Sequence, residues 1–196
     1  MVMKQHLMNP GTVIFLNGTS SSGKSTLLKQ LQWQLAEPYL EAGIDKFIFM
    51  LPPRYLDWPL WDDVLGRAAE SGEMGHRLFS GMHHAIAALA HAGNNVLADH
   101  VLVEPRWVRE CAELFAVLPA YLIGVRCPLA EINAREARRG DRTLGQAAKQ
   151  FYKAHAHGVY DFEVDTAVLS VEECAEQIKT FVAANTPNAF RQLRAV

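Results

Sequence analysis

The sequence has few cysteines and no pattern that pairs them. Cys111, Cys127 and Cys174 are far apart, odd in number and in no CxxC pair. Such spacing does not indicate a disulfide framework. We expect reduced, mostly buried thiols in a cytoplasmic protein, with a catalytic cysteine as the alternative.

Long apolar runs and an excess of positive charge are also missing. The longest nearly uncharged run, residues 114–125, contains Pro119 and is too short to span a bilayer. The first residues have no sustained apolar segment, so we expect no secretion signal and no membrane partner. The net charge of -2 and the pI near 6.4 give no basic footprint, so nucleic acid is not expected as a partner.

Strand patterns alternate with helix patterns along most of the 196 residues. Apolar and β-branched runs predict strands over residues 12–17, 39–44, 95–99, 120–127 and 161–166. Helical spacing predicts helices over residues 25–35, 75–92, 107–116, 129–138 and 146–157. Ser170 and Glu173 form a capping box that opens a final helix.

This alternation predicts an α/β fold with a five-stranded parallel sheet and helices on both faces. We expect one domain over residues 1–184 and a C-terminal tail over residues 185–196. Ligands of such sheets bind at the carboxyl ends of the strands. The residues at those ends are Gly18, Asp45, Asp99, Cys127 and Asp165.

The segment GTSSSGKS has the form GxxxxGK[ST] between a predicted strand and a predicted helix. Its glycines permit turns that aim backbone N–H groups inward, and the helix N-terminus adds positive charge, so the loop suits a polyphosphate. Lys24 would reach the terminal phosphates, and the Ser25 hydroxyl would coordinate Mg²⁺. The residues predicted to bind the nucleotide are Gly18, Thr19, Ser20, Ser21, Ser22, Gly23, Lys24, Ser25 and Thr26.

Two carboxylates are candidates for the chemistry beside this loop. Asp99 ends the third predicted strand, as a Walker B residue does, and would act on the metal side with Ser25. Asp45 ends the second predicted strand and could take the proton of an acceptor hydroxyl. The alternatives are that Asp99 is a structural cap or the base itself, and that Asp45 caps a following helix.

Arginines cluster in the segment REARRGDR, where residues 135–146 are a candidate lid over the site. Arg135, Arg138, Arg139 and Arg142 surround Gly140. Guanidinium groups can neutralise the charge of a transferring phosphoryl group, and a kinase must exclude water from its site. The alternative is a solvated face paired with Glu131 and Glu136.

Histidines and aromatic residues leave further questions open. No histidine pair has carboxylates or cysteines at metal-ligand spacing, so a structural or surface role is preferred. His100, next to Asp99, could contact a substrate or be structural. Tyr55, Trp58, Trp61 and Phe79 could form a wall for a flat acceptor or pack in the core.

The segments LNGTSSSGKS, EPYLEAGID, VRC, REARRGDR and YDFEVDT together resemble the chloramphenicol phosphotransferase-like family. The resemblance covers residues 12–45 and 95–180. It implies a P-loop NTPase fold similar to nucleotide and shikimate kinases, and ATP- and Mg²⁺-dependent transfer to a drug hydroxyl. It also implies that Asp45 is the base, that Arg139 and Arg142 act on the phosphates, and that Arg135 occupies a family position.

The chain also departs from this family. The family usually has two acidic residues where this sequence has Ala98-Asp99, and residues 46–94, where the acceptor should bind, match poorly. A kinase of a sugar or nucleotide-sugar, similar to the zeta toxins, is therefore an alternative. A nucleotide-dependent regulatory protein without a phosphoryl acceptor is another. The sequence leaves homo-oligomerisation open.

Overall fold

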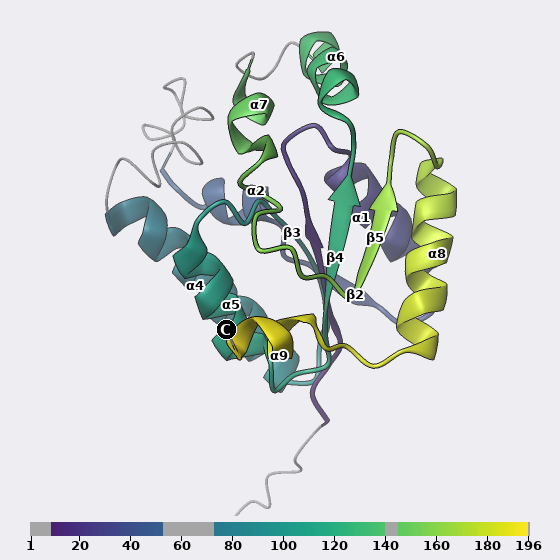
Figure 1. The fold of residues 1–196 in the computed structure, drawn as a ribbon. Helices are drawn as coiled ribbons and strands as arrows, with labels where there is room; N and C mark the ends of the chain where they lie inside the picture. Colours follow the sequence, from purple (N-terminus) through teal and green to yellow (C-terminus); the bar gives the residue numbers. More distant parts are fainter. Residues whose placement is uncertain (1–8, 53–72, 140–144, 196) are drawn as a thin grey trace, which may run out of the picture.

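The computed structural model describes residues 9–52, 73–139 and 145–195 (Figure 1). Its strands are β1 (Val13–Asn17), β2 (Tyr39–Glu41), β3 (Asn95–His100), β4 (Ala120–Arg126) and β5 (Phe162–Asp165). They form one sheet in the order β2-β3-β1-β4-β5, and every neighbouring pair is parallel. The prediction of a five-stranded parallel sheet is confirmed.

The central strand β1 sets the position of the glycine-rich loop. All five of its residues, VIFLN, are buried, because β1 lies between β3 and β4 and helices cover both of its faces. The register places Leu16 beside Asp99 and Asn17 beside His100. The loop that follows β1 therefore begins next to the carboxyl end of β3.

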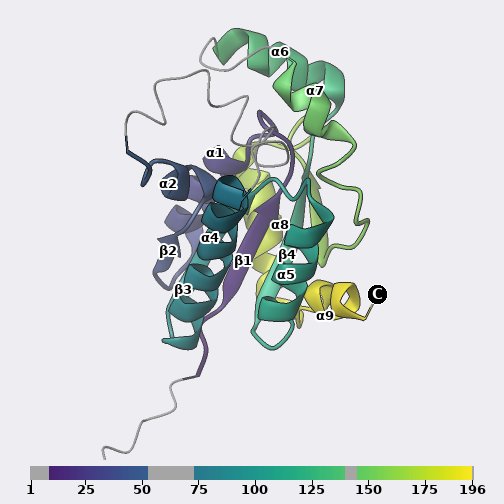
Figure 2. The same cartoon turned by 90° about the vertical axis from the view of Figure 1, so that its left-hand side faces the viewer.

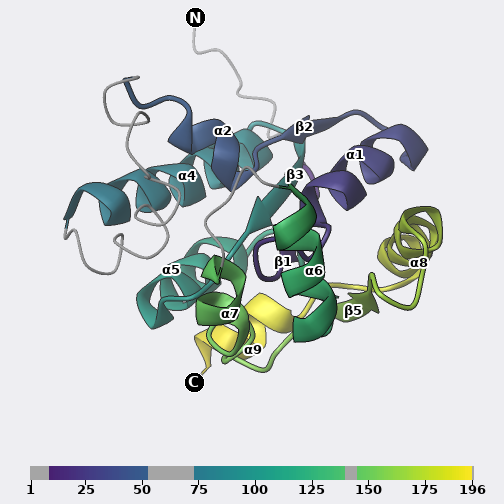
Figure 3. The same cartoon turned by 90° about the horizontal axis from the view of Figure 1, so that it is seen from above.

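Helices cover both faces of the sheet, as Figures 2 and 3 show. The helices are α1 (Lys24–Gln34), α2 (Ile44–Ile48), α4 (Glu73–His91), α5 (Pro105–Phe115), α6 (Leu129–Arg139), α7 (Gln146–Phe151), α8 (Val171–Ala184) and α9 (Ala189–Arg194). Helices α1 and α8 lie on one face, and α4, α5 and α9 lie on the other (Figure 3). Helices α6 and α7 lie above the carboxyl ends of the strands (Figure 1).

Two apolar clusters form the core, one on each side of the sheet. Val13 and Phe15 face α4, α5 and α9, whereas Ile14 and Leu16 face α1 and α8. This alternation explains why a continuous apolar run can be a strand. The three cysteines are buried and unpaired, as expected. Within the described ranges, no helix combines the length and apolarity needed to cross a membrane.

The second strand is shorter than predicted, and this changes the setting of Asp45. Strand β2 ends at Glu41, and helix α2 begins at Ile44, so Asp45 lies in the first turn of a helix. The prediction that Asp45 ends a strand is wrong. Helix α2 can begin there because the carboxylate of Asp99, on the neighbouring strand, accepts the backbone N–H of Ile44 at 3.2 Å.

Helix α7 also ends earlier than predicted, at Phe151 instead of residue 157. After Phe151 the chain continues in tighter turns, in which the N–H of Ala156 bonds to Lys153 and the N–H of Gly158 bonds to His155. The carbonyl of Ala154 is among the last four of a helix through residue 157, which have no partner within the helix, and here it accepts the Asn17 side-chain amide at 2.7 Å. Residues 152–157 are therefore turns that contact the end of β1.

The expected C-terminal tail contains helix α9, which packs on the sheet. Phe190 is only 2% exposed and contacts the rings of Phe15 and Phe115. The carboxylate of Asp161 accepts the N–H groups of Asn188 and Ala189 and so holds the start of the helix. The predicted capping box of α8 is present, with Ser170 and Glu173 each bonded to the other's backbone N–H.

Candidate active site

The glycine-rich loop has the backbone conformations that a phosphate cradle requires. Gly23 has φ 92° at the N-cap of α1, and Ser21 has φ 61°. Residues other than glycine rarely adopt such positive φ values. Gly18 approaches the carbonyl of Val125 so closely that a Cβ would overlap it. The loop is thus wrapped tightly between the ends of β1 and β4.

Several polar groups of this loop are buried. The Lys24 ammonium donates to the carbonyl of Thr19 at 2.6 Å, so it lies within the loop. The hydroxyl oxygens of Ser21 and Ser22 are buried and have no hydrogen-bond partner in the described part of the chain. Buried polar atoms without partners are costly. These hydroxyls therefore fit a loop completed by an anionic ligand.

Asp99 connects the loop to helix α2. The Ser25 hydroxyl donates to Asp99 Oδ2 at 3.0 Å, while Oδ1 accepts the N–H of Ile44. Gly43, the N-cap of α2, permits this approach because a Cβ at residue 43 would overlap Asp99 Oδ1. A carboxylate and a hydroxyl are oxygen ligands of the kind that Mg²⁺ prefers.

Burial raises the pKa of Asp99, and the nearby charge of Asp45 adds to this effect. The Lys24 ammonium and the hydrogen bond from Ser25 act in the opposite direction. A cation bound at this buried carboxylate would favour its ionised form, as the Lys24 ammonium already does.

Asp45 lies with these groups in one small cavity, although it is in a helix and not at a strand end. The cavity has a volume of about 70 Å³. Its lining residues are Ser20, Ser21, Gly23, Lys24, Ser25, Thr26, Ile44, Asp45, Asp99 and Val101. The structure therefore brings together the predicted phosphate loop, the predicted base and the predicted metal-side carboxylate.

A larger pocket, of about 430 Å³, opens on the other side of the loop. It contains Arg135, whose guanidinium donates to the hydroxyl of Thr166 at 3.0 Å and to its carbonyl at 2.8 Å. The Thr166 hydroxyl in turn donates to the carbonyl of Ser22. Ser21 lines both cavities. Thr166 thus holds Arg135 against the phosphate loop.

The other lid arginines are placed only in part. Arg138 pairs with Glu131 at 3.2 Å, as Arg135 does at 2.9 Å, so the alternative of a paired face applies to both. Arg139 is the last residue of α6, and Arg142 lies outside the described residues. Glu136 is buried, and its carboxylate accepts the N–H groups of Gly145 and Ala147. Among the described side chains, no arginine pairs with it.

Two residues of this site were not identified from the sequence. The side-chain oxygen of Gln150 accepts the backbone N–H of Ser20 at 3.0 Å, and Asn17 accepts the N–H of Leu102 at 2.9 Å. Both side chains are buried. A polar side chain at the apolar spacing of a helix was the available signal for Gln150, but its partner lies 130 residues away in the chain.

The structure describes some of the histidines and aromatic residues that the sequence singled out, and others lie outside the described residues. His100 is fully buried and its ring faces His83, so it is not exposed to a substrate in this structure. Among the described residues, no group of three or more potential ligands could hold a metal ion through protein groups alone. Phe79 packs in the core against Trp107, whereas Tyr55, Trp58 and Trp61 lie outside the described residues.

Comparisons with known proteins agree with this geometry. The family described as "Chloramphenicol phosphotransferase-like protein" matches residues 11–183. The "Putative O-phosphotransferase Rv2636" of Mycobacterium tuberculosis is 35% identical over 201 residues, which are 95% of this chain and 89% of that protein.

Solved structures share the fold at low sequence identity. The APS kinase CysC of Mycobacterium tuberculosis, in complex with AMPPNP and APS, has a TM-score of 0.60 at 16% identity and covers 90% of this chain and 99% of its own. The shikimate kinase of Acinetobacter baumannii, in complex with shikimate, has a TM-score of 0.61 at 14% identity, with coverage of 93% and 97%. The chain therefore has the fold of P-loop kinases.

Proposed function

The chain belongs to the chloramphenicol phosphotransferase-like family, and from this premise we propose that it is a kinase that transfers the γ-phosphate of ATP to a hydroxyl of a small molecule. One observation carries the proposal. The 70 Å³ cavity joins the phosphate loop to two carboxylates, Asp45 and Asp99, that come from two other elements. Phosphoryl transfer needs a phosphate cradle, a metal-side oxygen and a group that orients the nucleophile, all within reach of one point.

In this proposal the loop residues Gly18 to Thr26 hold the phosphates of ATP. Lys24 would turn from the Thr19 carbonyl to the terminal phosphates, and the orphaned hydroxyls of Ser21 and Ser22 would donate to phosphate oxygens. Ser25 and Asp99 are the residues that would hold Mg²⁺, which when bound supplies charge neutralisation at the phosphates. Arg135 and Thr166 would flank the remainder of the nucleotide.

Asp45 is proposed to orient the acceptor hydroxyl and to accept its proton. Its carboxylate shares the cavity with Lys24, so an acceptor between them would face the terminal phosphate. The transition state of such transfers is loose, so orientation contributes more than early proton removal. Arg139 and Arg142 are proposed to act on the transferring group from the lid at residues 135–146.

The acceptor class separates the remaining alternatives. Chloramphenicol or a related antibiotic is the acceptor that the family name suggests, and the name of the mycobacterial relative is consistent with transfer to oxygen. A sugar or nucleotide-sugar kinase is the second candidate. A regulatory protein without an acceptor is less well supported, because a nucleotide switch has no need for the Asp45 carboxylate in the phosphate cavity.

The test is a screen for phosphoryl transfer from ATP, with Mg²⁺, to hydroxylated antibiotics, sugars and nucleosides. Products are detected by mass spectrometry. Lys24→Ala should abolish transfer while the far-UV circular dichroism and melting temperature stay near those of the wild type. Lys29→Ala, an exposed lysine on the same helix, is the matched control and should retain activity. ATP hydrolysis without transfer to any acceptor would instead favour the regulatory protein.

A further inference from the structure

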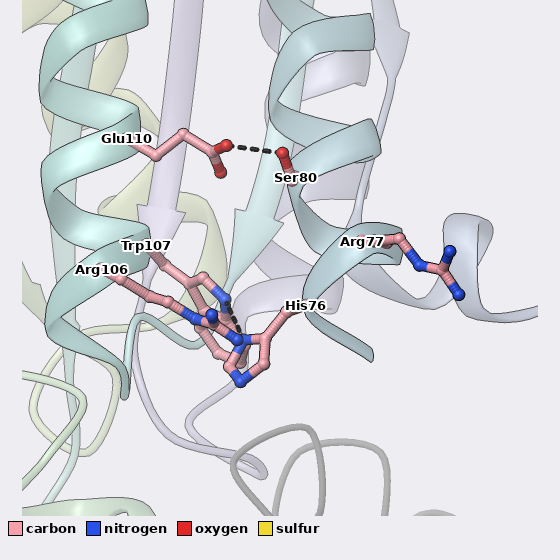
Figure 4. Close-up of a pocket in the computed structure, with 6 residues that line it drawn as sticks. All are labelled: His76, Arg77, Ser80, Arg106, Trp107 and Glu110. Carbon is pink, nitrogen blue, oxygen red and sulfur yellow. Dashed lines mark hydrogen bonds between the residues drawn. The ribbon is translucent and has the colours of Figure 1, made fainter. Parts of the chain in front are cut away.

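A third cavity lies between helices α4 and α5, and its described lining residues differ from those of the two cavities at the phosphate loop (Figure 4). Its volume is about 380 Å³, and its lining residues are His76, Arg77, Ser80, Arg106, Trp107 and Glu110. Helix α5 starts just after the carboxyl end of β3, and α4 leads into the start of β3. The first turns of both helices therefore lie at the edge of the sheet that also carries the phosphate loop.

The polar groups at the open end of this pocket are hydrogen-bond donors. The indole N–H of Trp107 donates to His76 Nδ1 at 3.1 Å, so the ring proton of His76 is on Nε2. Figure 4 shows Arg106 extending toward this pair, whereas Arg77 extends to the other side of α4. Within the described ranges, the Arg106 guanidinium has no hydrogen bond or ion pair.

The single carboxylate of the pocket already has its partners. Ser80 donates to Glu110 Oε1 at 2.5 Å, and His83 Nδ1 lies 2.5 Å from Oε2. Burial alone would raise the pKa of Glu110, but the bonds from Ser80 and His83 lower it overall. Glu110 is thus an ionised group whose oxygens are occupied. Because the oxygens of Glu110 are already occupied, the Arg106 guanidinium has no carboxylate partner among the described residues that line the pocket.

A layer of buried rings joins this pocket to the phosphate loop. Trp107 is 1% exposed and packs against Phe79 and His100. His100 accepts the N–H of Val101 through Nδ1, so its Nε2–H donates to His83 at 2.8 Å. The backbone carbonyl of His100 accepts the N–H of Gly18, the first residue of the loop. Trp107, which lines the pocket, is therefore connected through His100 to the first residue of the phosphate loop.

We infer that this pocket binds an anionic group, a carboxylate or a phosphate, carried by the acceptor whose hydroxyl is phosphorylated. The inference rests on the proposed kinase function and narrows its substrate class. The His76 Nε2–H and the Arg106 guanidinium, which both line the pocket, are donors of the kind that bind oxyanions. A neutral acceptor would leave these donors with water alone.

The test compares neutral acceptors with related acceptors that carry an anionic group. Glucose with gluconate, and glycerol with glycerol 3-phosphate, are two such pairs, one for a carboxylate and one for a phosphate. Equilibrium binding is measured by calorimetry with the nucleotide site saturated by a non-hydrolysable ATP analogue, and transfer from ATP is measured in parallel. We expect the anionic member of at least one pair to bind and react better than the neutral member.

Arg106→Ala should weaken the binding of that anionic acceptor roughly ten- to hundredfold, which is the usual effect of losing a charged hydrogen-bond donor. The affinity for the neutral acceptor should stay within about twofold. Arg106→Lys should restore part of the loss. Arg109→Ala, an exposed arginine one position outside the pocket on the same helix, is the matched control and should change neither.

The outcomes distinguish this inference from the kinase proposal. Absence of any preference for anions, or an anion preference that Arg106→Ala leaves intact, overturns the inference. Efficient transfer to neutral acceptors alone would also overturn the inference, but it would support the kinase function. Anion binding that depends on Arg106 without transfer to any acceptor would keep the pocket and overturn the kinase function.

Discussion

At the scale of single residues, Asp99 connects the phosphate loop to helix α2. One carboxylate oxygen accepts the Ser25 hydroxyl and the other accepts the first N–H of α2. The residue that places Asp45 in the cavity is therefore the same one that contacts the predicted metal ligand. A disturbance of Asp99 should affect both the metal side and the acceptor side of the reaction.

Gly43→Ala is a direct test of this connection. The new Cβ would overlap Asp99 Oδ1, so either the carboxylate or the start of α2 must move. We expect the free energy of unfolding to fall by about 1–3 kcal/mol. We also expect weaker Mg²⁺ binding, so that a higher Mg²⁺ concentration is needed for half-maximal activity. Urea unfolding and a Mg²⁺ titration of the transfer rate measure the two effects.

Gly81→Ala is the control for this substitution. Gly81 lies within α4, and a Cβ there would have no neighbour within 4 Å. Alanine in a helix interior should stabilise the protein by up to about 1 kcal/mol. If Gly43→Ala were as well tolerated as Gly81→Ala, Asp99 would not be packed against α2 as described.

Asp45→Asn separates a chemical role from a structural one. Asparagine keeps the size of aspartate in the first turn of α2, but it cannot take a proton and lacks the charge that favours a helix N-terminus by less than about 1 kcal/mol. We expect the turnover number to fall on the order of a hundredfold, with the KM for ATP and the melting temperature nearly unchanged. Glu41→Gln is a nearby acidic control, because Glu41 pairs only with the exposed Lys46 in the described structure. Full turnover of Asp45→Asn would remove Asp45 as the base.

At the scale of elements, the sequence was most informative where local and tertiary signals coincide. The run VIFLN, the loop GTSSSGKS and the leucine spacing of α1 predict a strand, a phosphate cradle and a helix, and all three are close to the structure. Patterns failed where one distant side chain determines the backbone. Asp99 starts α2, and Asp161 starts α9.

The site could be predicted in the same uneven way. Residues within the contiguous phosphate loop were identifiable because a short motif contains all of them. Gln150 and Gly43 were not, because their roles depend on partners in other elements. The pocket between α4 and α5 has no sequence motif at all, since its lining comes from two helices separated by a strand.

Helix α9 should contribute measurably to stability, although its sequence resembles a tail. Phe190→Ala removes a ring packed between Phe15 and Phe115, and losses of buried aromatic rings cost about 3–5 kcal/mol. Arg194→Ala breaks only an exposed ion pair with Glu113 and should cost less than about 0.5 kcal/mol. Urea unfolding of both variants measures the difference. Equal stabilities would mean that α9 is not docked on the sheet.

At the scale of the whole molecule, buried polar side chains are concentrated near the carboxyl ends of the strands. Four histidines belong to this layer: the buried His83 and His100 connect α4 to β3, and the half-buried His155 and His157 lie behind the end of β1. Burial lowers the pKa of all four, to about 3 for His155 and about 4 for His157. The same layer that shapes the site should therefore make the fold sensitive to acid.

The sign of this sensitivity follows from proton linkage. As the pH falls below about 6.5, these histidines bind protons in the unfolded chain but not in the folded one, so the free energy of unfolding decreases. The decrease should continue toward pH 4 and 3, where His157 and His155 become protonated in the folded state. The raised pKa of Asp99 acts in the opposite direction, because the folded state then takes up a proton first.

We therefore expect stability to be highest above about pH 6.5 and to fall between about pH 6.5 and pH 5, where most carboxylates remain ionised. Each histidine can contribute at most about 1.4 kcal/mol per pH unit, and the partly exposed His155 and His157 less. Urea unfolding at several pH values measures the slope. His155→Asn should reduce it, whereas His91→Gln, at an exposed position on α4, should not. A free energy of unfolding that is constant over this range would contradict the burial of these rings, because neutral histidines held in the fold must oppose protonation.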